Sequence, residues 1–360
     1  MVWQPLSEQV VPRRILAIDV GAGTQDILLY ESGQPIENSV KMVMPSRTVI
    51  VARLIEQVTD SGRALFLTGN LMGGGPSSEA VKRHIAAGLE VYATPLAAKT
   101  IHDNLDIVQS MGVVITDEAP AEAAIIETGD VDLSAIRAAL GQFEVELPDE
   151  FAVAVQDHGE SPFRSNRRFR FEHWEEFIQQ GGALTELAYR SVPNHLTRMR
   201  AVQRDVPGAL VMDTGAAAIW GALGDEEAAS HRSRGLIVAN IGNQHVLAAL
   251  VQGDRLWGLF EHHTRAMDRG KLAEYVDRLR SRGLPNEEVL NDGGHGAVVH
   301  PDFQAGEGFQ LVVVTGPNRH LARGLGYHEA VPYGDMMLSG CFGLLAASGI
   351  DLRKDHSFAG

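Results

Sequence analysis

The first segment whose residue types could do chemistry is ILAIDVGAGTQDILLY, residues 15–30. An apolar run ends at Asp19, a turn with Gly21 and Gly23 follows, and a second apolar run begins at Ile27. A plain hairpin needs a turn, but it does not need a carboxylate just before that turn. Glycines let backbone N–H groups come close to a phosphate, and carboxylate oxygens suit Mg²⁺. The segment therefore predicts a phosphate and metal site, with an ordinary glycine turn as the alternative.

A second segment, GLIVANIGNQHVLAALVQGD at residues 235–254, has the same plan of apolar strand, small polar turn and apolar strand. Hairpins with glycine turns are common, so the repetition by itself is only one indication. One such hairpin in each half of the chain predicts a duplicated architecture.

A candidate for acid–base chemistry ends the apolar run of residues 151–159, where Asp157 and His158 are followed by a glycine. A carboxylate at a strand end facing a cleft can act as a general base, with the imidazole as helper or substrate contact. The alternative is that Asp157 caps the next turn.

Two further polar segments have open interpretations. The glycine-rich residues 64–75 predict a ligand loop or a flexible turn, and Gly75-Pro76 stands where a P-loop has Lys-Ser/Thr. A cluster of arginines predicts either the binding of an anionic substrate or acidic partner, or a solvated loop paired with the chain's excess acids. Its members are Arg164, Arg167, Arg168 and Arg170.

The histidines give no metal site on sequence grounds. His262 and His263 are adjacent on a predicted strand, so their side chains should point to opposite faces. The GGHG segment at 293–296 is expected to be a mobile loop, and His295 and His300 alone do not make a metal site.

The apolar periodicity predicts strands that alternate with helices, which is typical of an α/β sheet with helices on its faces. Strands are expected over residues 14–20, 25–30, 35–44, 64–69, 89–94, 113–116 and 151–159. Helices are expected over 47–62, 78–87, 95–111, 208–224 and 336–349, and a strand, turn and helix over 308–324.

Composition narrows the class of protein. A chain of 360 residues with 44% apolar and 21% charged residues is globular and long enough for two domains. The net charge of −15 disfavours nucleic acid and anionic membranes as partners. The single cysteine, Cys341, excludes an intrachain disulfide and fits a cytoplasmic location. Residues 1–14 lack the apolar core of a signal peptide, and no membrane span is expected.

Five segments, in this order, resemble motifs of the actin / sugar-kinase / Hsp70 ATPase superfamily. They are residues 19–24 (first phosphate motif), 208–223 (first connecting helix), 240–244 (second phosphate motif), 314–318 (adenosine motif) and 338–349 (second connecting helix). The resemblance implies an α/β fold of two duplicated ribonuclease H-like domains with a nucleotide cleft between them. The first domain would cover 1–207 with an insertion, and the second 208–335, entered by a connecting helix. A C-terminal connecting helix within 336–360 would return toward the first domain.

The resemblance also implies the ligands, ATP and Mg²⁺, and a role for each matching residue. Asp19 would hold Mg²⁺. Asp157, with His158, would activate a small-molecule acceptor, and the arginine cluster is compatible with an anionic one. The nucleotide would be held by Gly21, Gly23, Thr24 and Gln25 on one side, by Gly242, Asn243 and Gln244 on the other, and by Gly316, Pro317 and Asn318 under the ribose and base.

More narrowly, the whole chain resembles the DUF1786 family, which is described as related to pyruvate formate-lyase activating enzyme. That activity needs a cluster held by three cysteines, and the chain has one, so we reject it. The second phosphate motif has Asn240 where the superfamily usually has an aspartate, and an amide brings no charge to a metal. Three hypotheses follow: a phosphotransferase or slow ATPase, a non-hydrolysing nucleotide-gated binding or regulatory protein, and a binder of some other phosphorylated ligand.

Overall fold

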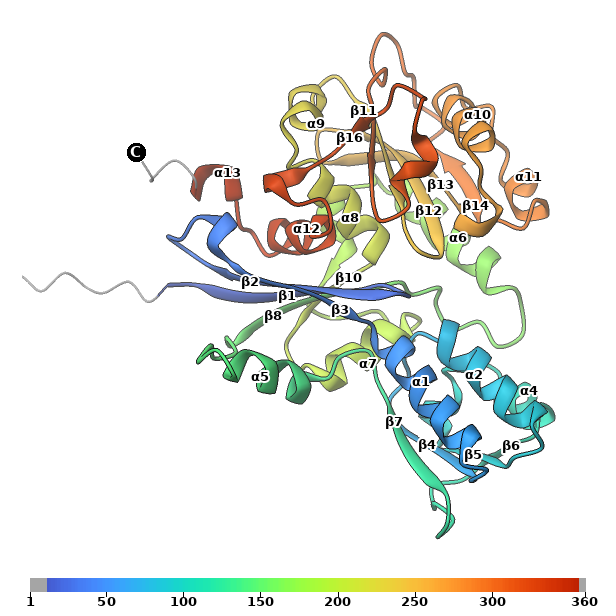
Figure 1. Cartoon of the computed structure of the whole chain (residues 1–360). Helices are drawn as coiled ribbons and strands as arrows, with labels where there is room; N and C mark the ends of the chain where they lie inside the picture. The colour runs from blue at the N-terminus through green and yellow to red at the C-terminus, as the bar shows by residue number, and fades with distance from the viewer. Residues whose placement is uncertain (1–11, 356–360) are drawn as a thin grey trace, which may run out of the picture.

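A computed structural model of the chain describes residues 12–355. The predictions made for the start of the chain and for the last five residues of the C-terminal segment, residues 1–11 and 356–360, lie outside the described part. Two six-stranded sheets and one four-stranded sheet form the framework (Figure 1).

The first six-stranded sheet crosses the middle of the molecule in the order β3-β2-β1-β8-β10-β9. β1 pairs antiparallel with β2 and parallel with β8, so the first strand of the chain lies inside the sheet. The strands are β1 (Arg14–Val20), β2 (Thr24–Glu31), β3 (Val40–Pro45), β8 (Glu150–Val155), β9 (Ala188–Tyr189) and β10 (Leu210–Met212).

The second six-stranded sheet repeats this plan in the order β14-β13-β12-β11-β15-β16. β11 pairs antiparallel with β12 and parallel with β15, as β1 does with β2 and β8. The repetition confirms the predicted α/β fold of two duplicated ribonuclease H-like units. The strands are β11 (Leu236–Ile241), β12 (His245–Gln252), β13 (Arg255–His263), β14 (Gly296–Val299), β15 (Val312–Thr315) and β16 (His328–Glu329).

Residues between β3 and β8 build a third, all-parallel sheet in the order β6-β5-β4-β7, with its own apolar core. Its strands are β4 (Leu65–Gly69), β5 (Val91–Ala93), β6 (Val113–Ile115) and β7 (Ala124–Thr128). Its helices are α1 (Arg47–Asp60), α2 (Gly75–Ala86), α3 (Pro95–Ala98) and α4 (Leu105–Ser110).

Two expectations for this inserted part were wrong. The helix expected over 95–111 is interrupted, because Asn104 caps α4 and its backbone N–H donates to His102 Nδ1. The edge strand β7 was not predicted, and one of its large apolar side chains, Ile125, is 64% exposed, which breaks the apolar signal of a buried strand.

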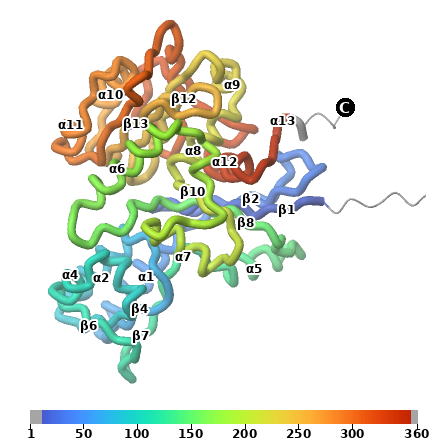
Figure 2. The backbone as a smooth tube through the Cα atoms, turned by 180° about the vertical axis from the view of Figure 1, so that it is seen from behind, coloured from blue at the N-terminus to red at the C-terminus, as the bar shows by residue number. Residues whose placement is uncertain are grey.

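Helices separate the layers of the molecule (Figures 1 and 2). On one face of the first sheet lie α5 (Leu133–Gly141) and α7 (Thr197–Asp205). Between the two six-stranded sheets lie α8 (Thr214–Ala222) and α12 (Ser339–Ala347), within the largest apolar core. The remaining helices are α6 (Asn166–Gln179), α9 (Glu226–His231), α10 (Arg269–Arg280), α11 (Asn286–Asn291) and α13 (Leu352–Asp355).

The first connecting segment differs from the single helix expected over 208–224. It begins as β10, which pairs with β8, and becomes α8 only after Asp213, whose carboxylate accepts bonds from the N–H groups of Gly215 and Ala216. Residues 35–44 likewise contain a 3₁₀ turn, Ile36–Asn38, before β3, and the helix expected near residue 320 is a 3₁₀ turn, Arg319–Ala322. Among the described residues, no helix combines the length and apolarity needed to cross a membrane.

α8 and α12 cross at glycines. A Cβ added to Gly221 of α8 would lie 1.7 Å from the carbonyl oxygen of Ser339, and one added to Gly343 of α12 would lie 1.9 Å from that of Ala217. The backbones are therefore in contact, and this contact sets the spacing between the two sheets.

Gly343→Ala is expected to lower the free energy of unfolding by about 1–3 kcal/mol, because the added methyl group overpacks the crossing. Urea unfolding measures the change. Gly141→Ala is the matched control, since a Cβ there meets nothing within 4 Å in α5, and it should be neutral or stabilise by up to about 1 kcal/mol. Equal effects of the two substitutions would contradict the tight crossing.

Candidate functional site

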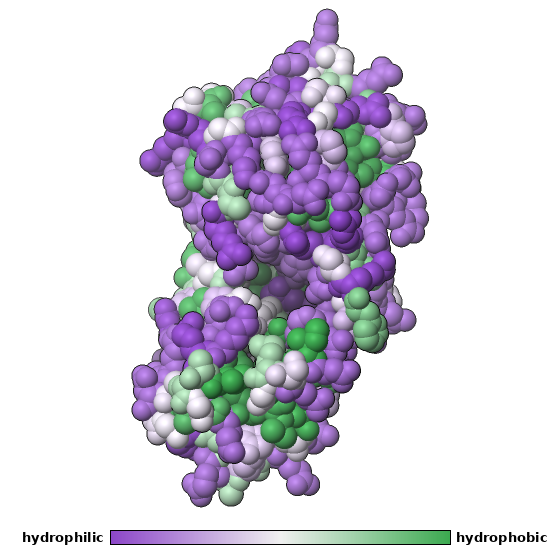
Figure 3. Space-filling model, turned by 90° about the vertical axis from the view of Figure 1, so that its right-hand side faces the viewer, coloured by the Kyte–Doolittle hydropathy of each residue, from purple (hydrophilic) through white to green (hydrophobic). Residues whose placement is uncertain are grey.

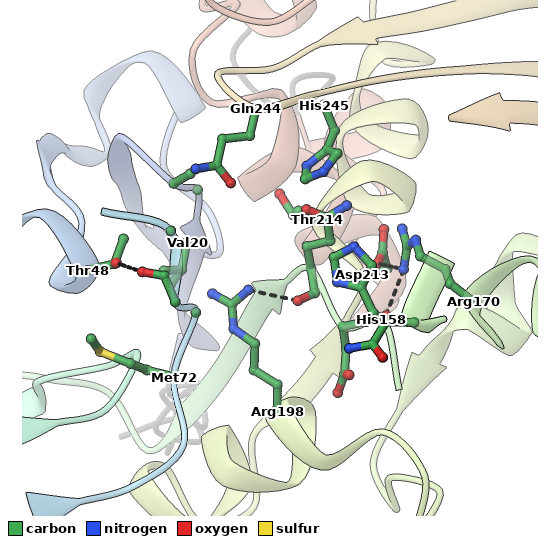
Figure 4. A pocket seen from close by; sticks show the side chains of 18 of the residues that line it. Val20, Thr48, Met72, His158, Arg170, Arg198, Asp213, Thr214, Gln244 and His245 are labelled. Carbon is green, nitrogen blue, oxygen red and sulfur yellow. Dashed lines mark hydrogen bonds and ion pairs between the residues drawn. The ribbon is translucent and has the colours of Figure 1, made fainter. Parts of the chain in front are cut away.

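A cavity of about 340 Å³ lies between the two halves of the molecule. In the space-filling view the molecule narrows at this level and is hollowed between its upper and lower parts (Figure 3). Four chain segments supply much of the lining, and they are residues 20–22, 71–75, 156–159 and 242–245. Figure 4 shows His245 reaching in from the β12 side and Arg198 from α7.

The structure brings about half of the predicted site residues to this cavity. Gly21, Asp157, His158, Gly242, Asn243 and Gln244 line it. The others, Asp19, Gly23, Thr24, Gln25, Gly316, Pro317 and Asn318, do not belong to its lining.

Each of the two hairpin turns is closed by one backbone bond. Gly21 N–H donates to the Thr24 carbonyl at 2.9 Å, and Gly242 N–H donates to the His245 carbonyl at 2.9 Å. The N–H groups at the two turn tips have no protein acceptor within residues 12–355. These tip residues are Ala22 and Gly23 in the first turn, and Asn243 and Gln244 in the second.

The two turn tips also touch each other. A Cβ on Gly23 would lie 2.7 Å from Asn243 Nδ2. Free backbone donors from the two sheets therefore face one small space, and such a cluster of N–H groups is suited to an anion.

The N-terminus of α2 reaches the same cavity. Gly74 is its N-cap, and the Thr48 hydroxyl donates to the Gly74 carbonyl at 2.5 Å, which holds the loop in place. A helix N-terminus carries free N–H groups and a partial positive charge, both favourable to an anion. The glycine-rich segment 64–75 thus contributes to the cavity wall.

Asp19 lies beside the cavity, facing α12. Its Oδ1 accepts from the Thr214 hydroxyl at 2.5 Å, and a Cβ on Gly340 would lie 1.8 Å from its Oδ2. Burial raises the pKa of Asp19 to about 7, against the opposing effect of the Thr214 hydrogen bond.

Asp26 stands directly opposite Asp19 in the β1–β2 ladder, so the two carboxylates share one face. Burial, followed by the charge of Asp19, raises the pKa of Asp26 to about 8, and its buried Oδ1 has no hydrogen-bond partner among the described residues. Two neighbouring carboxylates with an orphaned oxygen fit Mg²⁺, which takes one or two protein carboxylates and fills its shell with water and phosphate oxygens.

The predicted adenosine segment braces the second turn. Asn318 Nδ2 donates to the Gly242 carbonyl at 2.9 Å, and Gly316, at φ +95°, lies against the carbonyl of Ile241. Asn240 sits beside it and lines the cavity. The phosphate end of a nucleotide therefore has a cradle, while the segment predicted for the base lies behind that cradle.

Asp157 is held by two backbone donors. Its Oδ1 accepts from Gly159 N–H at 2.8 Å and its Oδ2 from Met199 N–H at 2.9 Å. Burial raises the pKa of Asp157 to about 6, against these two bonds. The geometry matches the capping alternative, and the catalytic role stays a prediction.

The four arginines of the predicted cluster separate into different environments. Arg164 and Arg168 pair with Glu172 and Glu287 at the exposed surface, and Arg167 donates to the Gly294 carbonyl. Arg170 is only 5% exposed. The cluster is therefore neither one anion site nor one solvated loop.

Arg170 bridges two buried carboxylates at the cavity wall. Its Nη1 lies 2.9 Å from Asp213 Oδ2 and its Nε 2.6 Å from Glu261 Oε2. Burial disfavours ionised Glu261, but the Arg170 charge outweighs it and holds the pKa of Glu261 well below its ordinary range. This network, like the Arg198–Asp130 ion pair at 2.8 Å, was missed on sequence grounds, because its partners are far apart in the chain.

Histidines gather at one end of the cavity. His158 and His245 line it, and His295 packs against both rings. Burial lowers the pKa of His245 to about 3 and that of His158 well below its ordinary value. The expectation of a mobile loop at 293–296 was wrong for His295, which is 1% exposed.

The prediction for the adjacent pair on β13 is matched. His262 bonds Asp292 on one face at 3.0 Å, whereas the ring of His263 packs against His295 on the other.

Arg170→Met should lower the free energy of unfolding by about 3–5 kcal/mol, because Asp213 and Glu261 would lose their only bridging cation. Arg168→Met, in the same helix, breaks an exposed pair and should change it by less than about 1 kcal/mol. Urea unfolding of both variants measures the difference. A loss for Arg170→Met no larger than that for Arg168→Met would show that the bridge does not stabilise the fold.

Asp26→Asn should stabilise the protein increasingly as the pH rises from 5 to 8. A carboxyl whose folded-state pKa is raised loses stability between its unfolded pKa and its folded pKa of about 8. The gain over wild type should grow by about 1–4 kcal/mol across that interval. Unfolding at both pH values in metal-free buffer measures it, with the exposed Asp60→Asn as the control. A gain independent of pH would contradict the assignment.

A search of curated proteins found no match. Among solved structures, the chain is similar to ethanolamine utilization protein EutJ from Carboxydothermus hydrogenoformans, with 13% identity, a TM-score of 0.33, and coverage of 95% of this chain and 90% of that chain. For the PilM–PilN type IV pilus biogenesis complex the values are 13%, 0.36, 94% and 98%. For an exopolyphosphatase-like protein they are 10%, 0.28, 84% and 66%, so this chain spans just under two thirds of its length. Similarities at this level give no information about the ligand.

A family model matches residues 72–321, and its description reads "Putative pyruvate format-lyase activating enzyme (DUF1786)". The matched segment includes the second hairpin and the histidine end of the cavity. Cys341 is free and buried, and its Sγ donates to the backbone carbonyl of Asp26 at 3.1 Å, so it packs as a core residue. By this match over more than half of its length, the chain belongs to the DUF1786 family.

Proposed function

We propose that this protein binds a nucleotide, ATP with Mg²⁺, with its phosphates in the cavity between the two glycine turns. The observation that supports this most directly is the set of free N–H groups at residues 22–23 and 243–244, in contact across the two halves. The α2 N-terminus adds a third donor segment in the same cavity. Neutral backbone donors can hold phosphate in a chain whose net charge is −15.

The activity that fits this cradle is phosphoryl transfer to a small acceptor, or slow hydrolysis of ATP. Mg²⁺, when bound, would neutralise charge that develops on the phosphate oxygens. Asp19 and Asp26 would hold the ion, directly or through water, and the turn tips would orient the phosphates. The acceptor would enter from the side of Asp157 and His158, where Lys99 and Arg198 also line the cavity and suit an anionic molecule. A cytoplasmic location is part of this proposal.

A second function is favoured by Asn240. It lines the cavity at the place where a carboxylate would strengthen metal binding, and Asp19 faces α12 instead of the cavity. Weak metal binding would slow turnover while leaving phosphate binding intact. The protein would then be a nucleotide-gated binding or regulatory protein, whose two halves close about the α8–α12 crossing.

Ala22→Phe tests the cradle by filling the cavity without changing a glycine. In wild type, Mg-ATP at 100 times its dissociation constant should stabilise the fold by about 2.7 kcal/mol, and Ala22→Phe should lose most of this gain. Ala87→Phe, on the exposed end of α2, is the matched control and should keep it. Thermal unfolding with and without Mg-ATP measures all three.

Absence of any ATP-dependent shift in wild type would overturn both nucleotide functions, and a full shift in Ala22→Phe would misplace the site. Analysis of products after incubation with Mg-ATP then separates the two functions. ADP formation, alone or with a phosphorylated acceptor, supports the enzyme, and intact ATP supports the gated binding protein.

A further inference from the structure

Three histidines from distant parts of the chain meet at one end of the cavity. His158 follows β8, His245 begins β12, and His295 immediately precedes β14. Each offers a ring nitrogen, and the three atoms all lie within 4.8 Å of one another. The ring centroids are 4.7 Å apart for His245–His295, 4.9 Å for His158–His295 and 5.9 Å for His158–His245.

We propose that His158, His245 and His295 form a binding site for a divalent transition-metal ion such as Zn²⁺. Imidazole nitrogens are preferred ligands of Zn²⁺, Cu²⁺, Ni²⁺ and Fe²⁺, whereas Mg²⁺ prefers oxygen. Nitrogens bound at 2.0–2.1 Å to a tetrahedral ion lie about 3.4 Å apart. From separations of at most 4.8 Å, small side-chain rotations bring the three nitrogens to that distance.

No competing hydrogen bond occupies the two cavity-facing rings. Within residues 12–355, no protein donor or acceptor bonds a side-chain nitrogen of His158 or His245. Histidines placed only for packing would usually have at least one such partner. The absence of a partner is expected for nitrogens that face a metal ion.

Glu261 supplies the outer partner that metal-binding histidines commonly have. Its Oε1 lies 3.4 Å from His295 Nδ1, and Arg170 and Gln156 fix the carboxylate. The buried charges are one positive, on Arg170, and two negative, on Glu261 and Asp213. A divalent cation beside this network meets an excess of negative charge.

Packing fixes His295 in position. Its backbone N–H donates to the Glu261 carbonyl at 2.9 Å, and a Cβ on the preceding Gly294 would lie 2.4 Å from the His262 ring. The glycine therefore allows the chain to pass close to β13 and to bring His295 to the other two histidines. This explains the GGHG segment, which phosphate binding does not use.

The site would be open toward the cavity. His158, His245 and Glu261 belong to the cavity lining, and three protein ligands with one open position are the arrangement of catalytic zinc sites. The open position would accept an oxygen atom of the anionic molecule that enters the cavity. The metal site is separate from the Mg²⁺ carboxylates Asp19 and Asp26, and its existence does not depend on nucleotide binding.

Equilibrium titration of the chelator-treated full chain with Co²⁺, without nucleotide, tests the proposal. Wild type should bind one Co²⁺ per chain, with visible absorption of a nitrogen-ligated ion, and Zn²⁺ should displace it. His245→Ala and His158→Ala should each weaken binding at least tenfold. His320→Ala, which removes an exposed histidine far from the cavity lining, should bind like wild type.

Circular dichroism and thermal unfolding confirm that each variant is folded, and His245→Gln replaces His245→Ala if the latter is not. Absence of stoichiometric Co²⁺ binding in wild type would overturn the proposal, as would equal affinity of the folded His158 and His245 variants and wild type. Because the titration contains no nucleotide, failure here leaves the Mg-ATP unfolding result unaffected, and failure there leaves this one unaffected.

Discussion

The backbone contact between α8 and α12 is the constraint on which the rest of the structure depends. Glycines at 221 and 343 let the helices approach until an added Cβ would lie 1.7–1.9 Å from a carbonyl oxygen. Both six-stranded sheets pack on these helices in one apolar core, so the crossing fixes how far apart the sheets lie. Only at that spacing do the turn tips at Gly23 and Asn243 touch and give the cavity its two sets of free N–H groups.

Electrostatics divides the cavity into parts with different chemistry. The turn tips and the α2 N-terminus offer neutral donors, which suit phosphate. Asp19 and Asp26, with their raised pKa values, lie against α12 and favour a cation. At the other end, Arg170 keeps Glu261 ionised beside a group of histidines. An anion, a hard cation and a transition metal can therefore each find a suitable place within one small region.

Much of the fold could be predicted from the sequence, because local signals carry it. The apolar runs around Asp19 and Asn240 gave the two hairpins, and their similarity indicated the duplication that the sheet orders show. Short elements failed: Leu210–Met212 looked like the start of a helix, since three apolar residues carry no period, and Asp213 is what separates strand from helix. The histidine site failed for a different reason. His158, His245 and His295 are separated by up to 137 residues, and only the packing of β13 against β12 and β14 brings them together.

The central claim is that phosphates lie between the two turns, held by their backbone N–H groups. A crystal structure of the protein with Mg²⁺ and a non-hydrolysable ATP analogue tests it most directly. We predict phosphate oxygens within hydrogen-bond distance of a backbone nitrogen at residue 22 or 23 and of one at residue 243 or 244. A nucleotide bound elsewhere, or one in this cavity with its phosphates turned away from both turns, would contradict the account.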